Sequence, residues 1–445
     1  MRIILLLVIT GSLLMSCSKE TESELLDEQL SQQLSDVSDG LGEAAFILPL
    51  SEELNKIPQD PLNPLTPSKV NLGKMLFHET AIALAPMQEI SIGTFSCASC
   101  HFAGAGFQAG RFQGIGDGGI GFGVNGESRH KRAQYDGDDL DVQPIRSPTI
   151  MNGAYQQNML WNGQFGATGV NENTQDAWTI GTPKENNFLG FEGLETQAIA
   201  GLGVHRMVID SILIYTTSYK DLFDNAFPNS PISERYSLIN AGLAIAAYER
   251  SVLANQAPFQ KWLRGETTAM TEIEKQGALL FFGKAACVDC HNSPALNSMT
   301  FYAMGMKDLV EYPEETFKTS LDNTQNLGRG GFTGNAQDNY KFKVPQLYNL
   351  KDSRFYGHGA SIRSIKEMVA YFNNGIAENN RVPSQQLAAE FRPLGLSEQE
   401  VEQISAFIEN ALYDDDLKRY EPESLPTGNC FPNNDPLSKR HLRCD

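Results

Sequence analysis

The feature that most constrains this chain is a short motif of two cysteines and a histidine that occurs twice. The stretch FSCASCHFAGAGF starts at residue 95, and the stretch AACVDCHNSP starts at residue 285, about 190 residues later. In each stretch two cysteines stand three apart and a histidine follows, a spacing compatible with a redox dithiol, half of a zinc site or a covalently attached haem. The six residues are Cys97, Cys100 and His101, and then Cys287, Cys290 and His291.

The chemistry of the motif favours haem. Two cysteines at i and i+3 on a turn of helix lie on one side, close enough to form thioethers with both vinyl groups of one porphyrin. The histidine after them then falls under the iron as the proximal ligand. Zinc would need all four cysteines to converge, and a redox dithiol would need neither the histidine nor a second copy. We therefore predict two c-type haems, with Cys97, Cys100, Cys287 and Cys290 as thioether residues and His101 and His291 as iron ligands.

The segments around both motifs predict an all-α fold. Amphipathic stretches at 67–83 and 271–286 both run through Gly-x-x-Leu-Phe towards the cysteines, as two copies of one small helical unit would. Convincing strand alternation is scarce, and 445 residues suggest two domains. We expect two cytochrome c-like domains, each around one covalently bound c-type haem, at 44–258 and 259–428. Further helices are expected at about 208–226, 233–254, 362–374 and 397–412.

Two loops carry motifs of low specificity. The glycine-rich region 103–127 contains a G-x-G-x-x-G match, but no strand precedes it and no amphipathic helix follows. We expect a long loop beside the first haem. The acidic run DGDDLD at 136–141 lacks the glycine and the distal glutamate of an EF-hand, so we expect a solvated acidic loop there.

The first residues are typical of an export signal. Residues 1–16 carry one positive charge at Arg2 and an apolar run too short to span a bilayer comfortably. The end of this segment, LLMSC, resembles the bacterial lipobox, which predicts lipidation of Cys17; the alternative is a plain cleaved signal in which Cys17 is incidental. Residues 17–43 are polar, acidic and without aromatics, so we expect a tether between the lipid and the folded body. The predicted location is the periplasm or cell envelope, with membrane contact through the lipid only.

The charge balance limits the partners, and the remaining two cysteines predict a disulfide. The chain has 35 Lys and Arg against 54 Asp and Glu, an acidic balance that disfavours nucleic acid and suits basic protein partners or simple solubility. Cys430 and Cys444 lie in the tail at 429–445, where an exported protein is expected to form a disulfide that closes a small loop. The sequence leaves the oligomeric state open.

Eight further segments appear in order along the chain. They are LGKMLF before the first motif, PIRSPTIMN at 144–152, LWNGQ at 160–164, LETQA at 194–198, AIAAYERSVL at 244–253, LGRGGFTG at 327–334, FKVPQLYNL at 342–350 and FYGHGASIRSI at 355–365. With the two haem motifs, they make the chain resemble the bacterial di-haem cytochrome c peroxidase family. That family includes the related methylamine-utilisation enzymes, which oxidise protein side chains.

The resemblance implies a division of labour between the haems. The C-terminal haem would take electrons from a small cytochrome or copper protein, and the N-terminal haem would bind and reduce hydrogen peroxide. Trp161 occupies the family's position for a tryptophan between the haems that assists electron transfer; the alternative is ordinary core packing. The expected activity is that of a cytochrome c peroxidase. The alternatives are oxidation of a protein or organic substrate through high-valent haem, and electron transfer without catalysis.

The N-terminal haem departs from the family pattern on its distal face. The histidine available as a displaceable ligand is His130, which is either that ligand or a surface residue. The family's catalytic glutamate precedes a methionine, but Arg206 precedes Met207 here. His205 is the candidate to move a proton and Arg206 to stabilise the leaving charge, provided that a turn lets both side chains reach one pocket. The alternative is a histidine that caps the start of a helix.

The C-terminal haem departs from the pattern too. The family's methionine or tyrosine ligand falls on Phe372, which cannot ligate iron, so Tyr371 or Met368 would have to substitute with a small shift in register. Otherwise this iron is five-coordinate or takes a ligand from elsewhere, such as Met304 or Met306. The family's calcium-ligating asparagine is replaced by Arg146, which offers no oxygen ligand from its side chain and makes calcium doubtful.

Overall fold

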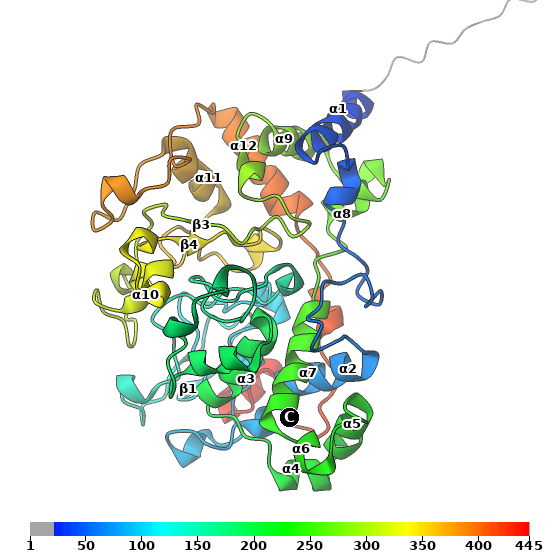
Figure 1. Ribbon diagram of the computed structural model, residues 1–445, viewed down its shortest axis with the longest axis vertical. Helices are drawn as coiled ribbons and strands as arrows, with labels where there is room; N and C mark the ends of the chain where they lie inside the picture. Colours follow the sequence, from blue (N-terminus) through cyan, green and yellow to red (C-terminus); the bar gives the residue numbers. More distant parts are fainter. Residues whose placement is uncertain (1–21, 445) are drawn as a thin grey trace, which may run out of the picture.

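A computed structural model describes residues 22–444, and it is mainly helical, as the sequence predicts (Figure 1). The short strands form two antiparallel pairs, β1 (Gly119–Ile120) with β2 (His130–Lys131), and β3 (Phe301–Tyr302) with β4 (Phe342–Lys343). The α-helices are α1 (Glu22–Val37), α2 (Pro67–His78), α3 (Gly193–Val204), α4 (Ser211–Thr216), α5 (Tyr219–Ala226), α6 (Ile232–Arg235), α7 (Leu238–Ser251), α8 (Pro258–Leu263), α9 (Glu272–Phe282), α10 (Arg329–Thr333), α11 (Ile365–Asn374), α12 (Glu398–Ala406) and α13 (Pro436–Leu442). A π-helical turn, Phe407–Ala411, continues α12.

The two helices that lead to the motifs pack in the same way. In α2, a methyl group on Gly73 would lie 1.8 Å from the carbonyl oxygen of Ala244 in α7. In α9, a methyl group on Gly277 would lie 1.9 Å from the carbonyl oxygen of Gln403 in α12. Each glycine is the first residue of a Gly-x-x-Leu-Phe segment, so this repeated sequence has a physical cause. The missing side chain lets a later helix cross at close range.

The first helix overturns an expectation. Helix α1 buries Leu26, Leu30 and Leu34, which recur every fourth residue and form one apolar stripe against α9. Asp27 also pairs with Lys275 of α9 at 2.6 Å. The prediction of a solvated tether is therefore wrong for the α1 residues, because their leucine spacing was overlooked among the charged residues. Cys17 and the predicted signal lie outside the described residues, and within 22–444 no helix is long and apolar enough to cross a membrane.

The two ends of the described chain pack on opposite halves of the molecule (Figure 1). Helix α1 lies beside α9, near the second motif, whereas the tail after residue 429 lies against the first motif. Cys430 and Cys444 form the predicted disulfide. The hydroxyl of Ser99 donates to Asn433 Oδ1 at 2.6 Å, and the hydroxyl of Ser96 donates to the Pro432 carbonyl at 2.9 Å. The tail therefore holds the turn that carries the first motif.

Most of the predicted helices are present, but the long ones are interrupted. The stretch 362–374 is α11, and 397–412 is α12 with its π-helical turn. The stretch 208–226 divides into α4 and α5, and 233–254 is divided between α6 and α7. Thr217 and Ser237 lie at the breaks, and Ser237 caps α7 by accepting from Asn240 N at 3.2 Å. These polar residues favour caps over helix interiors.

Candidate functional site

Both motifs fold onto the same tight backbone turn. In η4 (Cys97–Ser99), a single 3-10 turn, the Cys97 carbonyl accepts hydrogen bonds from the N–H groups of Cys100 and His101, each at 3.2 Å. The second motif repeats this pattern on η12 (Cys287–Asp289), where distances to the corresponding carbonyl are 3.2 and 3.0 Å. The two sites therefore start from the same local geometry, and their differences come from the surroundings.

The two motif histidines make the same kind of hydrogen bond and are both suited to act as iron ligands. His101 Nδ1 lies 3.2 Å from the Phe107 carbonyl, and His291 Nδ1 lies 2.7 Å from the Leu296 carbonyl. Burial lowers the pKa of each imidazole to about 4, so both rings are neutral at pH 7. A neutral ring that donates through Nδ1 keeps the Nε2 lone pair free. This is the tautomer that binds a metal through Nε2.

The motif cysteines fit thioether formation better than zinc binding. None of the four is in a disulfide, and burial raises the pKa of Cys100 and of Cys287 to about 12, which keeps these thiols protonated. Zinc would need deprotonated thiolates that converge. Among residues 22–444 no cluster of three or more histidine, cysteine or acidic residues is arranged to hold a metal ion. The donor set of each motif therefore fits a c-type haem.

A histidine and a carboxylate lie beside the first motif. His205 Nδ1 donates to Asp141 Oδ2 at 2.8 Å; the His205 side chain is 37% exposed and the Asp141 side chain only 6%. Burial lowers the pKa of His205, but the charge of Asp141 and the hydrogen bond to it outweigh burial and raise that pKa. Burial acts in the opposite sense on Asp141, and the charge of His205 with its neighbours lowers the pKa of this carboxyl. Each residue of the pair therefore stabilises the charged form of the other, and a proton is held on His205 next to the Asp141 carboxylate.

The turn that the His205 and Arg206 hypothesis requires is present. Helix α3 ends at Val204, His205 is its C-terminal cap, and Arg206 adopts a left-handed backbone with φ of 61°. The chain reverses there, so the two side chains are not constrained by helical geometry. His205 reaches Asp141, whereas the Arg206 guanidinium binds Asp117 and donates to the Asp139 carbonyl at 2.9 Å. His205 caps the end of a helix rather than its start.

The histidine and carboxylate pair lies within electrostatic reach of the first motif. Burial is the main cause that raises the pKa of the Cys97 and Cys100 thiols, and the Asp141 carboxylate adds to it. Burial likewise lowers the pKa of His101, and the neighbouring His205 lowers it further. The pair and the motif therefore belong to one site.

The glycine-rich loop closes over this site. A methyl group on Gly114 would lie 2.8 Å from Cys100 Sγ, and one on Gly116 would lie 2.3 Å from Asp141 Oδ2. Glycine at both positions lets the loop approach the motif and the carboxylate. The expected solvated acidic loop at 136–141 is wrong at its end, because Leu140 and Asp141 are buried. Sequence reasoning missed Asp141 because it stands last in a run of otherwise surface-like acidic residues.

His130 lies on the surface. It is exposed on β2, and its Nδ1 lies 2.8 Å from the Ser128 carbonyl. An exposed ring held by its own loop matches the surface alternative, and His205 is the histidine that lies beside the first motif.

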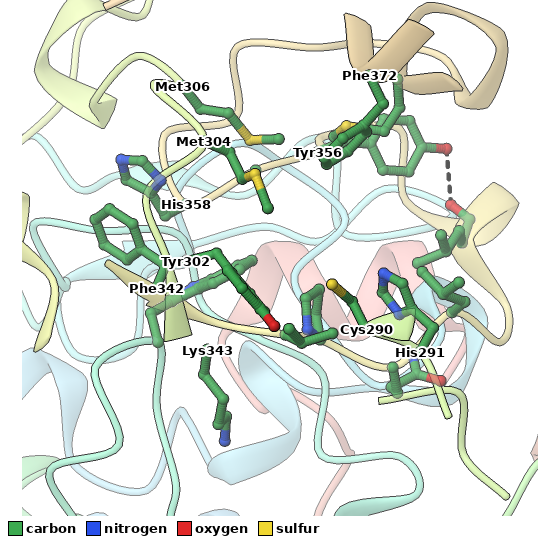
Figure 2. A pocket seen from close by; sticks show the side chains of 18 of the residues that line it. Cys290, His291, Tyr302, Met304, Met306, Phe342, Lys343, Tyr356, His358 and Phe372 are labelled. Atoms are coloured by element: carbon green, nitrogen blue, oxygen red, sulfur yellow. Dashed lines mark hydrogen bonds between the residues drawn. The ribbon is translucent and has the colours of Figure 1, made fainter. Parts of the chain in front are cut away.

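The second motif opens onto a cavity of about 300 Å³. Cys287, Cys290 and His291 form part of its wall. Figure 2 shows Met304 and Met306 across the cavity from Cys290 and His291, with both thioethers directed inwards. The remaining wall is mostly apolar. It includes Met368, Phe372, Phe342, Val344 and Ile365. A flat apolar cofactor attached at the cysteines would fit this space.

The residues proposed as substitutes for Phe372 have different surroundings. Met368 lines the cavity, as Phe372 does. The Tyr371 hydroxyl donates to the Met304 carbonyl at 2.6 Å and is not among the described cavity-lining residues. Tyr371 therefore fixes the backbone of Met304, whereas the thioethers of Met304, Met306 and Met368 reach the cavity.

Trp161 lies in the wall of the cavity at the second motif and contacts several segments there. Its Nε1 donates to the Arg146 carbonyl at 2.8 Å, and its carbonyl accepts from Lys343 N at 2.8 Å. Its ring lies 6.4 Å from the ring of His358, in an edge-on contact. His358 itself stacks on Phe342 at 3.7 Å. This position suits either electron transfer or packing, the two alternatives derived from the sequence.

Comparisons with known proteins show what the whole chain is similar to. A family model described as di-haem cytochrome c peroxidase matches residues 67–268. A cytochrome-c peroxidase, IdrP1, of Denitromonas iodatirespirans is 29% identical over 390 residues, which cover 83% of this chain and 87% of that protein. The methylamine utilization protein MauG of Methylorubrum extorquens is 27% identical and covers 79% of this chain and 80% of its own length. Among solved structures, a MauG-like protein associated with microbial copper homeostasis has a TM-score of 0.55 at 22% identity, over 83% of this chain and 95% of that one, which supports the fold.

Proposed function

We propose that this chain, which is similar to the bacterial di-haem cytochrome c peroxidases, reduces hydrogen peroxide with electrons from a small redox protein. The observation that carries the proposal is the hydrogen bond of 2.8 Å between His205 and Asp141 beside the first motif. This pair supplies proton chemistry at the position where the family's glutamate is missing.

Two c-type haems are the proposed cofactors. Each would be held by the two thioethers and the histidine of one motif, and it would supply iron for binding peroxide or for passing electrons. The neutral, Nδ1-bonded histidines and the protonated thiols support this assignment. Calcium is not required by the proposal, because Arg146 stands where the family has an asparagine ligand.

The chain's own residues would manage the protons. Reduction of one peroxide molecule takes two electrons and two protons and releases two water molecules. The free Nε2 of His205 would accept a proton from one peroxide oxygen and return it to the departing oxygen, while Asp141 orients the ring. Arg206 is the candidate to stabilise negative charge on the departing oxygen, and Asp117 holds its guanidinium in place.

Electrons would enter at the second motif. We propose that Met304 would help His291 to hold the haem iron, since its thioether faces His291 across the cavity and its backbone is fixed by Tyr371 (Figure 2). A methionine and histidine pair of ligands suits electron transfer. Trp161 is the proposed link between the sites. The donor is a small cytochrome or copper protein of unspecified identity.

We also propose export and lipid anchoring at Cys17, which would place the protein in the periplasm or cell envelope. The domain division at 44–258 and 259–428 stays a proposal. The packing of α1 on α9 supports adding α1 to the second unit, and the hydrogen bonds of Ser96 and Ser99 support adding the tail to the first.

A second candidate function is electron transfer without peroxide chemistry. It is favoured by the ion pair between Arg206 and Asp117, because a paired guanidinium is less available to a developing negative charge. Oxidation of a protein or organic substrate is the other enzymatic alternative.

Rapid mixing of the fully reduced protein with hydrogen peroxide distinguishes these functions. The peroxidase proposal requires fast reoxidation of the first haem and continued peroxide consumption when a reduced cytochrome is supplied. If the first haem stays reduced, the peroxidase proposal is wrong and electron transfer without catalysis is favoured. Oxidation of an added organic donor in preference to the cytochrome would favour the remaining alternative.

A further inference from the structure

Arg146 is a buried cation without a carboxylate partner. Its side chain is 2% exposed, and its Nη1 donates to the Arg111 carbonyl at 2.8 Å. Its Nη2 donates to Gln108 Oε1 at 2.8 Å, to Ser353 Oγ at 2.7 Å and to the Ala109 carbonyl at 3.3 Å. All these acceptors are neutral. Within residues 22–444 no carboxylate forms a hydrogen bond or an ion pair with this guanidinium.

Two other buried arginines have an anionic partner. Arg250 pairs with Glu195 at 2.7 Å, and Arg129 lies 3.6 Å from Asp435. Arg146 differs from both, although burial of its charge costs free energy that an anion would offset. Burial lowers the pKa of Arg146 to about 9, so the guanidinium still carries its charge at pH 7. No carboxylate of the described chain offsets this buried charge, so the site can accept a negative group.

The cavity at the second motif is where that negative group can lie. Arg146 forms part of the wall that also contains Cys287, Cys290 and His291. The Arg146 N–H donates to the His358 carbonyl at 2.9 Å, which fixes the backbone at the cavity wall. Arg363 adds positive charge nearby, because both guanidiniums lie over the ring of Phe355, at 5.2 and 4.2 Å.

The other buried cation of this wall differs from Arg146. Lys343 donates to the Asn158 carbonyl at 2.6 Å and to Gln156. Figure 2 shows its amino group directed away from His291 and the two methionines. Burial lowers the pKa of Lys343 to about 7, so this amine can lose its charge by releasing a proton. An arginine needs an anion instead.

We propose that Arg146 binds a propionate carboxylate of the porphyrin attached at Cys287 and Cys290. Carboxylate is the anion that a guanidinium binds best through its planar N–H groups, and the porphyrin brings two of them into the cavity. The inference rests on the proposed haem at the second motif, but not on the peroxide reaction. Because Gln108 Oε1 and the Arg111 carbonyl accept hydrogen bonds from the same guanidinium, Arg146 would connect the propionate to the loop that follows the first motif.

A cation at this place has a measurable electrostatic effect. Positive charge near an iron disfavours the oxidised, more positive state, so Arg146 raises the reduction potential of the second haem. Arg146→Gln removes the charge and keeps polar atoms, and Arg146→Lys keeps the charge. We expect the midpoint potential of the second haem to fall in Arg146→Gln and to stay close to the wild-type value in Arg146→Lys. The redox-difference infrared spectrum of Arg146→Gln should gain a protonated-carboxyl band.

A matched control separates this effect from simple destabilisation. Arg329 is also buried and also donates to neutral acceptors, but it is not part of the cavity wall in the described chain. Arg329→Gln should lower thermal stability without moving the potential of the second haem. A normal potential in Arg146→Gln, with both haems present by the pyridine haemochrome assay, would overturn the inference.

The same measurements identify the source of the anion. A free anion in the cavity would make the wild-type potential depend on added phosphate, whereas a propionate would leave it unchanged by phosphate. Dependence on phosphate would therefore overturn the inference. Loss of haem from the wild-type second motif would instead contradict the proposed cofactor, which keeps the two failures distinct.

Discussion

The two motif sites share a turn, a half-buried histidine and a similarly packed preceding helix, but the loops around them differ. Beside the first motif lie four charged or titratable side chains in two pairs, Asp141 with His205 and Asp117 with Arg206. The second motif opens onto an apolar cavity of about 300 Å³ with thioethers across from its histidine. The surroundings of the first motif therefore offer groups that can hold protons, whereas those of the second offer an apolar cavity.

This difference corresponds to two kinds of redox chemistry. Cleavage of a peroxide bond requires groups that move protons and stabilise charge. Passing an electron requires neither, and it is favoured by a ligand set that stays the same in both oxidation states. The repeated Gly-x-x-Leu-Phe unit therefore supplies a common attachment geometry, and the loops around it supply the specialisation.

The largest predicted effect tests whether the sites are independent. Replacing Cys97 and Cys100 by alanine should remove one haem, and replacing Cys287 and Cys290 should remove the other. The ratio of haem to protein, measured by the pyridine haemochrome assay, should fall from two to one in each variant. If either double variant lost both haems, or neither, the division into two separate attachment sites would be wrong.

The next effect concerns only the first site. His205→Ala should slow peroxide turnover by on the order of a hundredfold, because it removes the proposed proton carrier. The reduction of the second haem by the donor should keep its wild-type rate. His130→Ala is the matched control, since this histidine is exposed, and it should leave turnover unchanged. Equal rates in His205→Ala and wild type would contradict the proposed role.

The coupling between His205 and Asp141 predicts a pH dependence. His205 must be neutral to accept a proton, and its pKa is raised, so turnover should increase as pH rises through this value. In Asp141→Asn the pKa of His205 should fall, and the acidic limb of the pH profile should move to lower pH. Turnover at the plateau should also decrease, by roughly tenfold, because the ring loses its orienting partner.

The same pair makes a contribution to stability that has a defined sign. A raised pKa in the folded state means that protonated His205 stabilises the fold at pH values below its unfolded pKa. That stabilisation disappears as pH rises through the raised pKa. We therefore expect the melting temperatures of wild type and Asp141→Asn, measured across this pH range, to converge at high pH. Curves that diverge with rising pH would contradict the assignment.

Much of the second site's attachment chemistry could be predicted from local sequence, and much of the first site's proton chemistry could not. The two motifs and their upstream helices are contiguous patterns, so spacing alone identifies them. Asp141 and His205 are 64 positions apart in the sequence, and their side chains meet only in the fold. The hydrogen bond from Asp141 N to the Asp117 carbonyl, at 3.0 Å, holds the backbone of Asp141 in place. No periodic pattern records such a long-range contact.

The wrong prediction for α1 and the missed role of Arg146 have a similar explanation. Composition made the segment of α1 look like a tether, although Leu26, Leu30 and Leu34 form a stripe that needs α9 as a partner. Arg146 was interpreted only as the loss of an oxygen ligand. Its burial and its neutral acceptors, which depend on the fold, make it a candidate anion site.

A smaller effect is predicted for the ligand of the second iron. Met304→Leu should shift the absorption spectrum of the second haem and lower its reduction potential, because a thioether ligand favours the reduced iron. Met368→Leu is the matched control, since it lines the same cavity from α11, and it should leave the spectrum unchanged. A shift in Met368→Leu with a normal spectrum in Met304→Leu would assign the ligand to the sequence-predicted position instead.

The smallest effect is expected at Trp161, the proposed link between the sites. Trp161→Phe keeps an aromatic ring but removes the hydrogen bond from Nε1 to the Arg146 carbonyl, which should cost about 1 kcal/mol of stability. If the indole carries electrons between the sites, reoxidation of the second haem after peroxide addition should slow a few fold in this variant, while peroxide binding at the first site stays normal. Gln164→Ala, in the same segment, is a control for disturbance of the loop. If Trp161→Phe lowers stability and leaves the electron-transfer rate unchanged, Trp161 is a packing residue and the two sites are connected by another route.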